Sequence, residues 1–535
     1  MKREFKNLTK EPFDLIIIGG GIIGTGVARD AALRGLRTLL VEREDFAYGT
    51  TSRSTRLIHG GLRYLRMLDF KLVHQDLHER EILLKIAPHL VHRLEFVIPL
   101  LKSAPFYRFT LPFGLRLYNW LSHGVSLPPC HRLSPKKTLT FEPSLAHTEG
   151  LVGAYLYYDC QAEYTERLCI ENILDAAGRG AVILNHAAMT DINFKDGAVS
   201  GINFKDALTA EEYRANGRTV LNASGPWTDL VLHKSEAGRA YNIRKTKGIH
   251  LYTDKISGNA LVLFAKSDGR LFFVVPWLDY SLIGTTDTDY SGDLDKVHAE
   301  KSDVDYLVSE LRSYFPDFKQ SDIHFTTAGL RPLVPSGKKS ASNTSRAHKL
   351  VDHEQRDGIK GFVSILGGKN TAYRGIAEEA VDLVCKKLGV ITACITAQTP
   401  LPGAPAVSQT EREKAARASG LPIETIAHLD SIYGSRLNAV LSYAREDKQL
   451  GNPVSPGGRD ILAQIKHAVL EEQAVSVSDF MMRRSFIGLR PDQGLDAVDT
   501  VAREMGTLLG WNSAETQKQA ADYRAAAALG QLYKE

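Results

Sequence analysis

The sequence predicts an α/β protein with an N-terminal parallel-sheet domain, a mixed-sheet domain interleaved with it, and an all-α C-terminal domain. Three observations predict this fold. Near the N-terminus, a buried strand, a glycine-rich turn, a helix and a second strand follow one another. Strand-like runs at 181–204 and 261–287 suggest a further sheet packed on that unit. Past the Pro-rich stretch 399–407 the apolar residues take helical spacing, so we expect the first two domains in 1–398 and a helical domain in 408–535.

The first domain is predicted from "DLIIIGGGIIGTGVARDAALRGLRTLLVERED". Residues 15–18 form an uninterrupted apolar run, typical of a strand buried on both faces, and an alanine-rich helix over 27–34 follows the turn. The turn has the pattern G-x-G-x-x-G, formed by Gly19, Gly21 and Gly24. Glycines let the backbone approach a pyrophosphate at the helix N-terminus, and Glu42, ending the strand 37–42, is placed to bond a ribose. The pattern therefore predicts a Rossmann-like dinucleotide-binding domain rather than a plain glycine-rich turn.

The cofactor and the electron source follow from the position of this motif. The pattern alone does not separate FAD from NAD, but its place at the extreme N-terminus favours FAD. We find no second G-x-G-x-x-G between a strand and a helix that would bind NAD(P)H. The electrons are therefore expected to come from a bound organic substrate.

Composition excludes several classes of protein. Lys plus Arg is 66 against 62 for Asp plus Glu, a net charge of +4 that does not call for nucleic acid. The five cysteines are odd in number and lack C-x-x-C spacing, so neither a zinc site nor a disulfide framework is predicted and the setting is expected to be cytosolic. No apolar run reaches the roughly 18 residues of a membrane-spanning helix. Any membrane contact is therefore expected to be peripheral.

A stretch crowded with hydroxyls and cations, "TTSRSTRLIHGGLRYL", covers residues 50–65. It brings together Arg53, Arg56, His59, Arg63 and Tyr64. A solvated basic face is one interpretation, and a site for an anionic ligand is the other.

This stretch resembles the signature of the FAD-dependent, quinone-linked glycerol-3-phosphate dehydrogenases, T-S-S-x-S-S-K/R-L-I-H-G-G-L-R-Y-L. Other segments agree with the family in the same order and cover most of residues 14–380. They are "YYDCQAEYTERL" (157–168), "LNASGPWTD" (221–229), "TKGIHL" (246–251), "VVPWLDYSLIGTTDTDY" (274–290), "AGLRPL" (328–333) and "LGGKNTAYR" (366–374). Asn370 and Ala372 depart from the family pattern, which leaves Thr371 to bond the flavin ring.

The resemblance implies oxidation of sn-glycerol 3-phosphate, a small dianion with a secondary alcohol. Such a site needs cations for the phosphate, a proton acceptor, and positive charge beside the C2 oxygen. The resemblance assigns to the phosphate Arg63, Tyr64, Arg346 and Lys369. Arg331 is the candidate cation beside C2, and His59 is the candidate base because its ordinary pKa lies near neutrality. Lys247 and Thr285 are expected to complete the wall; a core histidine and structural ion pairs are the alternative interpretations.

The remaining candidates concern FAD. Gly19, Gly21, Gly24 and Glu42 are expected at its phosphates and ribose. Short hydroxyls reach phosphate oxygens without crowding, and the candidates are Thr51, Ser52 and Ser54. Gly225, Gly367 and Gly368 are expected where the backbone passes close to the cofactor. A buried hydroxyl cluster and ordinary turn glycines are the alternatives.

Two regions bear on partners. A helix is predicted over 70–92, and residues 93–127 mix aromatics and leucines with Lys102, Arg108 and Arg116. That mixture is typical of an interfacial membrane anchor or of a packed helix with a snorkelling arginine. The resemblance favours peripheral attachment to the cytoplasmic face of the membrane and electron transfer to a quinone. For the C-terminal domain we expect a structural or dimer-forming role.

Three rival functions stay open. An oxidase would pass the electrons to O2 and release H2O2 from the same site. An amino-acid oxidase or dehydrogenase would need a carboxylate clamp but no phosphate cluster. A non-enzymatic FAD-stabilised binding protein would not reduce its flavin with any polyol phosphate.

Overall fold

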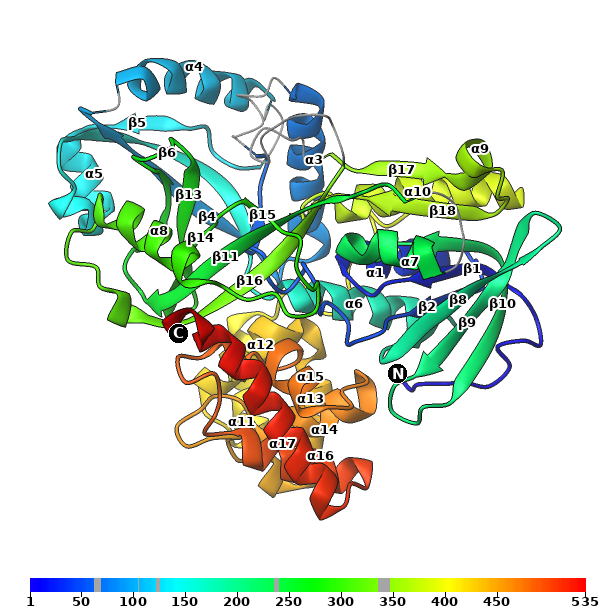
Figure 1. The fold of residues 1–535 in the computed structure, drawn as a ribbon. Helices are drawn as coiled ribbons and strands as arrows, with labels where there is room; N and C mark the ends of the chain where they lie inside the picture. The colour runs from blue at the N-terminus through cyan, green and yellow to red at the C-terminus, as the bar shows by residue number, and fades with distance from the viewer. Residues whose placement is uncertain (62–68, 104, 122–125, 235–239, 335–346) are drawn as a thin grey trace.

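The computed structural model describes residues 1–61, 69–103, 105–121, 126–234, 240–334 and 347–535 (Figure 1). Two sheets lie side by side, and the C-terminal helices pack beneath them (Figure 1). The chain passes between the sheets several times, as expected for interleaved domains.

The first sheet has the strand order β17-β18-β10-β1-β2-β7. Its bounds are β1 (Phe13–Ile18), β2 (Thr38–Val41), β7 (Val182–Leu184), β10 (Glu212–Asn222), β17 (Lys349–Asp352) and β18 (Phe362–Leu366). β1 pairs in parallel with both β2 and β10. The apolar run is thus buried at the centre of a parallel sheet, as its continuous pattern predicts.

Helices cover one face of this sheet. They are α1 (Ile22–Leu33), α6 (Thr165–Gly178) and α10 (Tyr373–Leu388). Val27 and Ala31 of α1 share a buried core with Ile170 of α6 and Ala377 of α10. The small residues of α1 let all three helices approach one another closely, which holds the turn before α1 in a fixed place.

Residues 181–204 do not belong to the second sheet, contrary to the prediction. β7 extends the first sheet in parallel beside β2, and β8 (Ala187–Lys195) and β9 (Ala198–Asp206) form a hairpin that pairs with β10. The all-apolar run 182–184 fits the edge of a parallel layer, and local strand periodicity does not reveal which sheet a strand joins.

The second sheet is mixed, with the order β15-β11-β14-β13-β12-β4-β6-β3, and with β16 on β11 and β5 on β6. Its bounds are β3 (Leu57–Ile58), β4 (Val91–Leu101), β5 (His131–Leu133), β6 (Leu151–Ala162), β11 (Arg244–Asp254), β12 (Ala260–Phe264), β13 (Leu271–Trp277), β14 (Tyr280–Gly284), β15 (Thr288–Asp289) and β16 (Ile323–Leu333). α8 (Lys301–Arg312) packs on β11, since Val304 and Leu307 share a core with Ile249. The run 261–287 therefore lies in the expected sheet.

The helix expected over 70–92 is shorter, and a strand follows it. α3 (Phe70–Ile86) ends at Ile86, with Ala87 as its C-cap, and β4 begins at Val91. Pro88 disfavours helical backbone at the preceding residue, which explains the early end. After β4 the chain forms α4 (Pro105–Leu121), on the upper side of the molecule in Figure 1.

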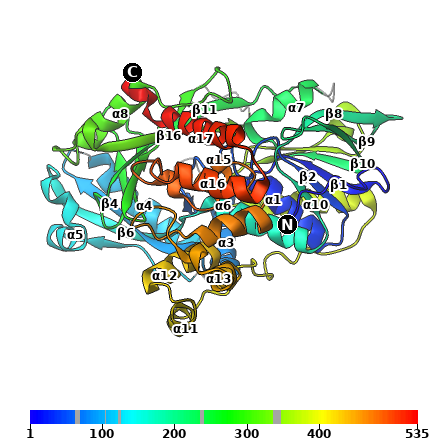
Figure 2. The same cartoon turned by 90° about the horizontal axis from the view of Figure 1, so that it is seen from below.

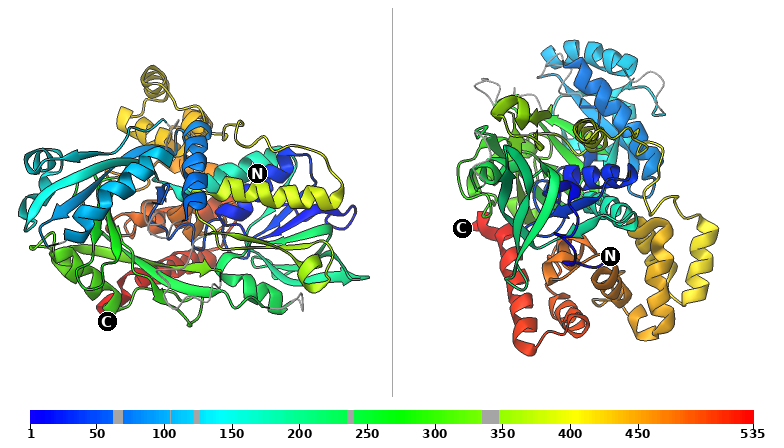
Figure 3. Two further views of the ribbon diagram at one scale, coloured as in Figure 1. Left: turned by 90° about the horizontal axis from the view of Figure 1, so that it is seen from above. Right: turned by 90° about the vertical axis from the view of Figure 1, so that its right-hand side faces the viewer.

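The C-terminal part is helical, as expected. It contains α11 (Gln409–Ser419), α12 (Ile423–Tyr433), α13 (Leu437–Glu446), α14 (Leu462–Glu471), α15 (Val477–Arg483), α16 (Val498–Leu509) and α17 (Ser513–Ala528). Figures 2 and 3 show these helices lying across the lower side of both sheets. Arg484 pairs with Asp45 of the first sheet's domain at 2.9 Å, and both side chains are fully buried. The boundaries 1–398 and 408–535 themselves stay a prediction.

Within the described residues, no helix is both long enough and apolar enough to cross a bilayer.

Candidate active site

The turn between β1 and α1 is shaped by glycine. A Cβ at Gly24 would lie 1.9 Å from the Gly19 carbonyl oxygen, so no other residue fits there without moving the turn. Gly19 itself has a φ of +112°. The Glu42 carboxylate accepts the Gly20 N–H at 2.6 Å, and the Thr51 hydroxyl accepts the Ile22 N–H at 3.1 Å. Because the turn is built from glycines, its backbone can approach a bound ligand closely.

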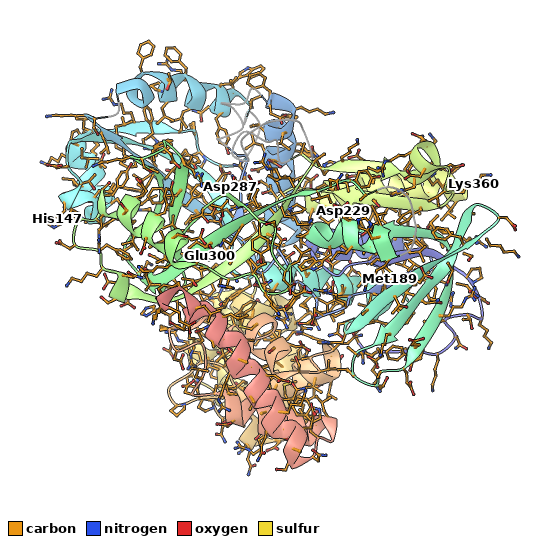
Figure 4. The ribbon with its side chains drawn as sticks, viewed as in Figure 1. His147, Met189, Asp229, Asp287, Glu300 and Lys360 are labelled. Atoms are coloured by element: carbon orange, nitrogen blue, oxygen red, sulfur yellow. The ribbon has the colours of Figure 1, made fainter. Side chains whose placement is uncertain are left out.

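A cavity of about 210 Å³ opens over this turn. Among its lining residues are Gly19, Gly21, Glu42, Thr51, Gly225, Gly367 and Gly368. Met189, which also lines it, is labelled in Figure 4. This first cavity has the cradle that a dinucleotide needs: bare backbone, a helix N-terminus and an acid at the neighbouring strand end.

A second cavity of about 240 Å³ lies between the two sheets and adjoins the first. Both are lined by Thr50, Pro332, Gly368, Lys369 and Asn370. The second is also lined by the sequence candidates Ser54, His59, Thr285, Arg331 and Thr371. An elongated cofactor in the first cavity can therefore extend its far end to the wall on which these side chains lie.

His59 is a half-buried, neutral ring. Burial lowers its pKa to about 4, with the Asp159 carboxylate acting in the opposite direction. Nδ1 accepts the Gly61 N–H at 3.1 Å, so the hydrogen of the neutral ring is assigned to Nε2. Nε2 has no hydrogen-bond partner among the described residues. His59 thus presents an N–H here, and it becomes a proton acceptor at Nε2 only in the other tautomer.

Arg331 spans the wall of the second cavity. Its Nη1 donates to the Thr286 carbonyl at 3.0 Å and to Asp287 Oδ1 at 3.2 Å, and its Nη2 donates to the Thr285 hydroxyl. Asp287 lies near the middle of the molecule in Figure 4. A Cβ at Gly248 would lie 2.1 Å from Nη2, so the glycine of β11 makes room for the guanidinium. The arginine is held flat against the sheet while 21% of its side chain stays exposed to the cavity.

Lys369 follows the glycine pair after β18. Its ammonium forms an ion pair with Asp76 of α3, which is fully buried. Burial raises the pKa of Asp76 to about 6, and the Lys369 charge opposes that rise. Lys369 is thereby fixed at the boundary of the two cavities.

Comparison with known proteins identifies the family. Residues 14–374 match the model for FAD dependent oxidoreductases, and residues 394–516 match the model for the C-terminal domain of alpha-glycerophosphate oxidase. A glycerol-3-phosphate dehydrogenase of Synechocystis sp. is 38% identical over 97% of this chain and 97% of its own. An aerobic glycerol-3-phosphate dehydrogenase of Staphylococcus haemolyticus is 35% identical over 95% and 93%. The chain belongs to the family of FAD-dependent glycerol-3-phosphate dehydrogenases.

A solved structure of the family supports the cofactor. The glycerol-3-phosphate dehydrogenase from Bacillus halodurans, complexed with FAD, matches with a TM-score of 0.79 and 29% identity, over 98% of this chain and 96% of that one. The glycine cradle and the two adjoining cavities fit an extended dinucleotide. FAD is the cofactor.

The structure does not place every candidate at the cavities. Arg63, Tyr64 and Arg346 lie outside the described residues. Ser52 lines neither cavity, because its hydroxyl donates to the backbone carbonyls of Tyr48 and Gly49.

Lys247 does not lie at the wall, which corrects the sequence prediction. Its ammonium pairs with Asp303 at 2.8 Å and with Glu300 at 3.3 Å, on the α8 side of β11. Side chains alternate along a strand, so Gly248 and His250 face the second cavity while Lys247 faces away.

His250 is a titratable cavity residue that the sequence analysis missed. Its Nε2 lies 2.9 Å from the Thr55 hydroxyl, and burial, with the Arg331 charge, lowers its pKa to about 3. It stands in the quoted "TKGIHL" motif, and the period of two along the strand was the signal that selects it over Lys247. Arg56 also lines this cavity, but its guanidinium is bound at 2.8 Å by both oxygens of Glu166.

Proposed function

We propose that this protein oxidises sn-glycerol 3-phosphate to dihydroxyacetone phosphate and passes the electrons to a membrane quinone. The observation that carries the proposal is that His59, Arg331 and Lys369 line the cavity next to the dinucleotide cradle, and that Lys369 lines both cavities. Two cations beside a neutral histidine suit an anionic alcohol. The names of the relatives support the same substrate.

Each side chain has a part in the chemistry. FAD supplies, at N5, the acceptor for the hydride that leaves C2. Lys369 attracts the phosphate as a point charge, and Arg331 stabilises the negative charge that develops on the C2 oxygen. The C2 hydroxyl proton passes to His59 Nε2 in the tautomer whose hydrogen lies on Nδ1. In that tautomer Nδ1 carries the hydrogen and can no longer accept the Gly61 N–H. Proton transfer to Nε2 therefore requires the loss of this hydrogen bond in the turn at 59–61.

Anaerobic titration tests the reaction. Glycerol 3-phosphate is expected to bleach the flavin absorbance of the purified holoenzyme, and glycerol at the same concentrations is expected to leave it yellow. An amino acid that bleaches the flavin, or equal bleaching by glycerol, would refute the proposal. A flavin that no polyol phosphate bleaches would indicate a binding protein.

The acceptor is a separate part of the proposal. In air, a quinone-linked enzyme turns over with a soluble quinone analogue and releases little peroxide. An oxidase would release one H2O2 for each substrate oxidised, without any quinone. The ratio of quinone reduced to peroxide formed therefore separates the two functions.

Membrane attachment is supported by the outer face of α4. Phe109, Phe113 and Trp120 are 73%, 58% and 72% exposed, and with Arg116 they follow the i, i+4, i+7, i+11 spacing of one helical face. An aromatic stripe with a cation suits the interface of a bilayer. We infer that this face rests on the cytoplasmic surface of the cell membrane. Self-association through the C-terminal domain stays a prediction.

The double substitution Phe113→Ser/Trp120→Ser is expected to weaken vesicle binding. Each side chain contributes on the order of 1.5 kcal/mol when it leaves water, so partitioning onto vesicles should fall roughly 100-fold. Co-sedimentation with vesicles of neutral and anionic lipid measures it. Leu495→Ser is the control, because Leu495 is 47% exposed in the helical C-terminal part. Equal sedimentation of all three proteins would place the membrane contact elsewhere.

Lys369→Ala is expected to weaken substrate binding more than catalysis. Loss of a charged contact is worth about 1.5–3 kcal/mol, so the Kd of glycerol 3-phosphate should rise at least tenfold. Substrate dependence of flavin reduction gives the Kd. Lys387→Ala is the matched control: Lys387 is 12% exposed and pairs with Asp352, as Lys369 is 11% exposed and pairs with Asp76. If both variants bind substrate alike, Lys369 does not hold the phosphate.

A further inference from the structure

The turn that carries His59 is tied down at each of its backbone N–H groups. The His59 N–H donates to the Thr371 hydroxyl at 3.1 Å, and the Gly61 N–H donates to His59 Nδ1 at 3.1 Å. The middle N–H, that of Gly60, donates to Asp159 Oδ1 at 3.3 Å. The position of the imidazole therefore depends on where the Asp159 carboxylate is held.

Side chains from two helices hold the Asp159 carboxylate. Asp159 lies on β6 and is 1% exposed. Arg80 of α3 donates to its Oδ1 at 2.6 Å, and the Tyr118 hydroxyl of α4 donates to its Oδ2 at 2.8 Å. Both donors are buried, and neither lines the second cavity. The positions of α3 and α4 therefore determine where the Asp159 carboxylate lies, and the carboxylate in turn holds the Gly60 amide.

Tyr118 also packs directly against the turn. A Cβ at Gly60 would lie 2.5 Å from the Tyr118 hydroxyl oxygen and 2.5 Å from a methyl carbon of Leu77. No space remains between the hydroxyl and the turn, and Tyr118 lies on the inner side of α4, opposite the exposed aromatic stripe. Removing the hydroxyl therefore removes a bond to Asp159 and a steric stop for Gly60 together.

We propose that Asp159 and Tyr118 are positioning residues of the reaction, which fix the His59 ring over the substrate through the Gly60 amide. This inference rests on the proposed function and adds two residues that line neither cavity. The Asp159 charge supports it, because it opposes the effect of burial on His59 and keeps the ring more basic than its surroundings would. Displacement of a reacting group by about 1 Å is enough to slow a reaction strongly.

Stopped-flow reduction of the holoenzyme by glycerol 3-phosphate, without oxygen, tests the inference. For Tyr118→Phe the limiting rate of flavin reduction is expected to fall on the order of tenfold, because the turn relaxes into the space of the hydroxyl. The substrate Kd should stay within about twofold, because Tyr118 does not reach the cavity that binds the phosphate. Asp159→Asn, which keeps an acceptor oxygen but loses the charge, should also slow the limiting rate.

The control removes another buried hydroxyl. Tyr523 of α17 is 1% exposed, and its hydroxyl donates to the Gln493 carbonyl. Tyr523→Phe is expected to lower the melting temperature without changing the rate. An unchanged limiting rate in Tyr118→Phe, or a rise in Kd that explains the whole loss, overturns the inference.

The two proposals fail in different ways. If glycerol 3-phosphate does not bleach the wild-type flavin, the proposed function is refuted and the inference with it. If glycerol 3-phosphate reduces the flavin of the wild type and of Tyr118→Phe at the same rate, only the inference is refuted. Should Asp159→Asn not fold once Arg80 loses the Asp159 charge, the rate and Kd of Tyr118→Phe still decide.

Discussion

His59→Ala is expected to slow anaerobic flavin reduction by glycerol 3-phosphate roughly 10²- to 10⁴-fold, the range for loss of a general acid or base. His59 is the base that the sequence analysis proposed, and it lines the second cavity. Its pKa of about 4 keeps the imidazole neutral at physiological pH. Since the phosphate is bound elsewhere, the substrate Kd should change little. Stopped-flow absorbance at several substrate concentrations separates the two quantities.

The control for this change is His467→Ala. His467 is fully buried in α14, far from the cavity along the chain, and lies 3.4 Å from Glu472. Its loss should lower stability and leave the rate alone. A His59→Ala enzyme that reduces its flavin at the wild-type rate would remove the histidine from the mechanism, and His250 would then be the remaining histidine at the described wall.

Arg331→Met is expected to have the second largest effect. The guanidinium is held by Thr285, Thr286 and Asp287 before substrate arrives, so its charge stabilises the developing C2 oxyanion without rearrangement. Removal of such a group costs about 10²- to 10³-fold in rate. Arg331→Lys should recover little, because a single ammonium cannot replace the planar fork. The limiting rate of flavin reduction measures both.

Arg244→Met provides a matched control for that change. Arg244 lies on β11, pairs with Asp289 at 2.6 Å and is 25% exposed, close to the 21% of Arg331. It lines neither cavity. Equal losses in both variants would mean that any cation near this edge of the sheet suffices.

The nucleotide half of the fold was predictable because its signals are local. The apolar run, three glycines and Glu42 lie within about thirty residues. Gly19 and Gly24 are required by the backbone at their own positions. The sheet to which residues 181–204 belong was not predictable, because strand pairing joins segments far apart in the chain. The end of α3 at Ile86 had a local signal in Pro88.

For the site, motif position did not separate two residues of one motif. Lys247 and His250 both stand in "TKGIHL", but strand alternation turns Lys247 toward Asp303 and His250 toward the cavity. Arg56 is neutralised by Glu166, 110 residues later in the chain. The Asp159–Tyr118 support could not be read from the sequence, since it needs the packing of β6 and α4 around one backbone amide.

The central claim is that cationic side chains from distant segments of the chain bind a dianionic alcohol beside the flavin. A crystal structure of the holoenzyme with dihydroxyacetone phosphate, the proposed product, tests it most directly. We expect the ligand in the second cavity, with its phosphate against Lys369 and its C2 oxygen within hydrogen-bond distance of Arg331 and His59. A ligand bound elsewhere, or one whose phosphate points away from Lys369, would contradict the account.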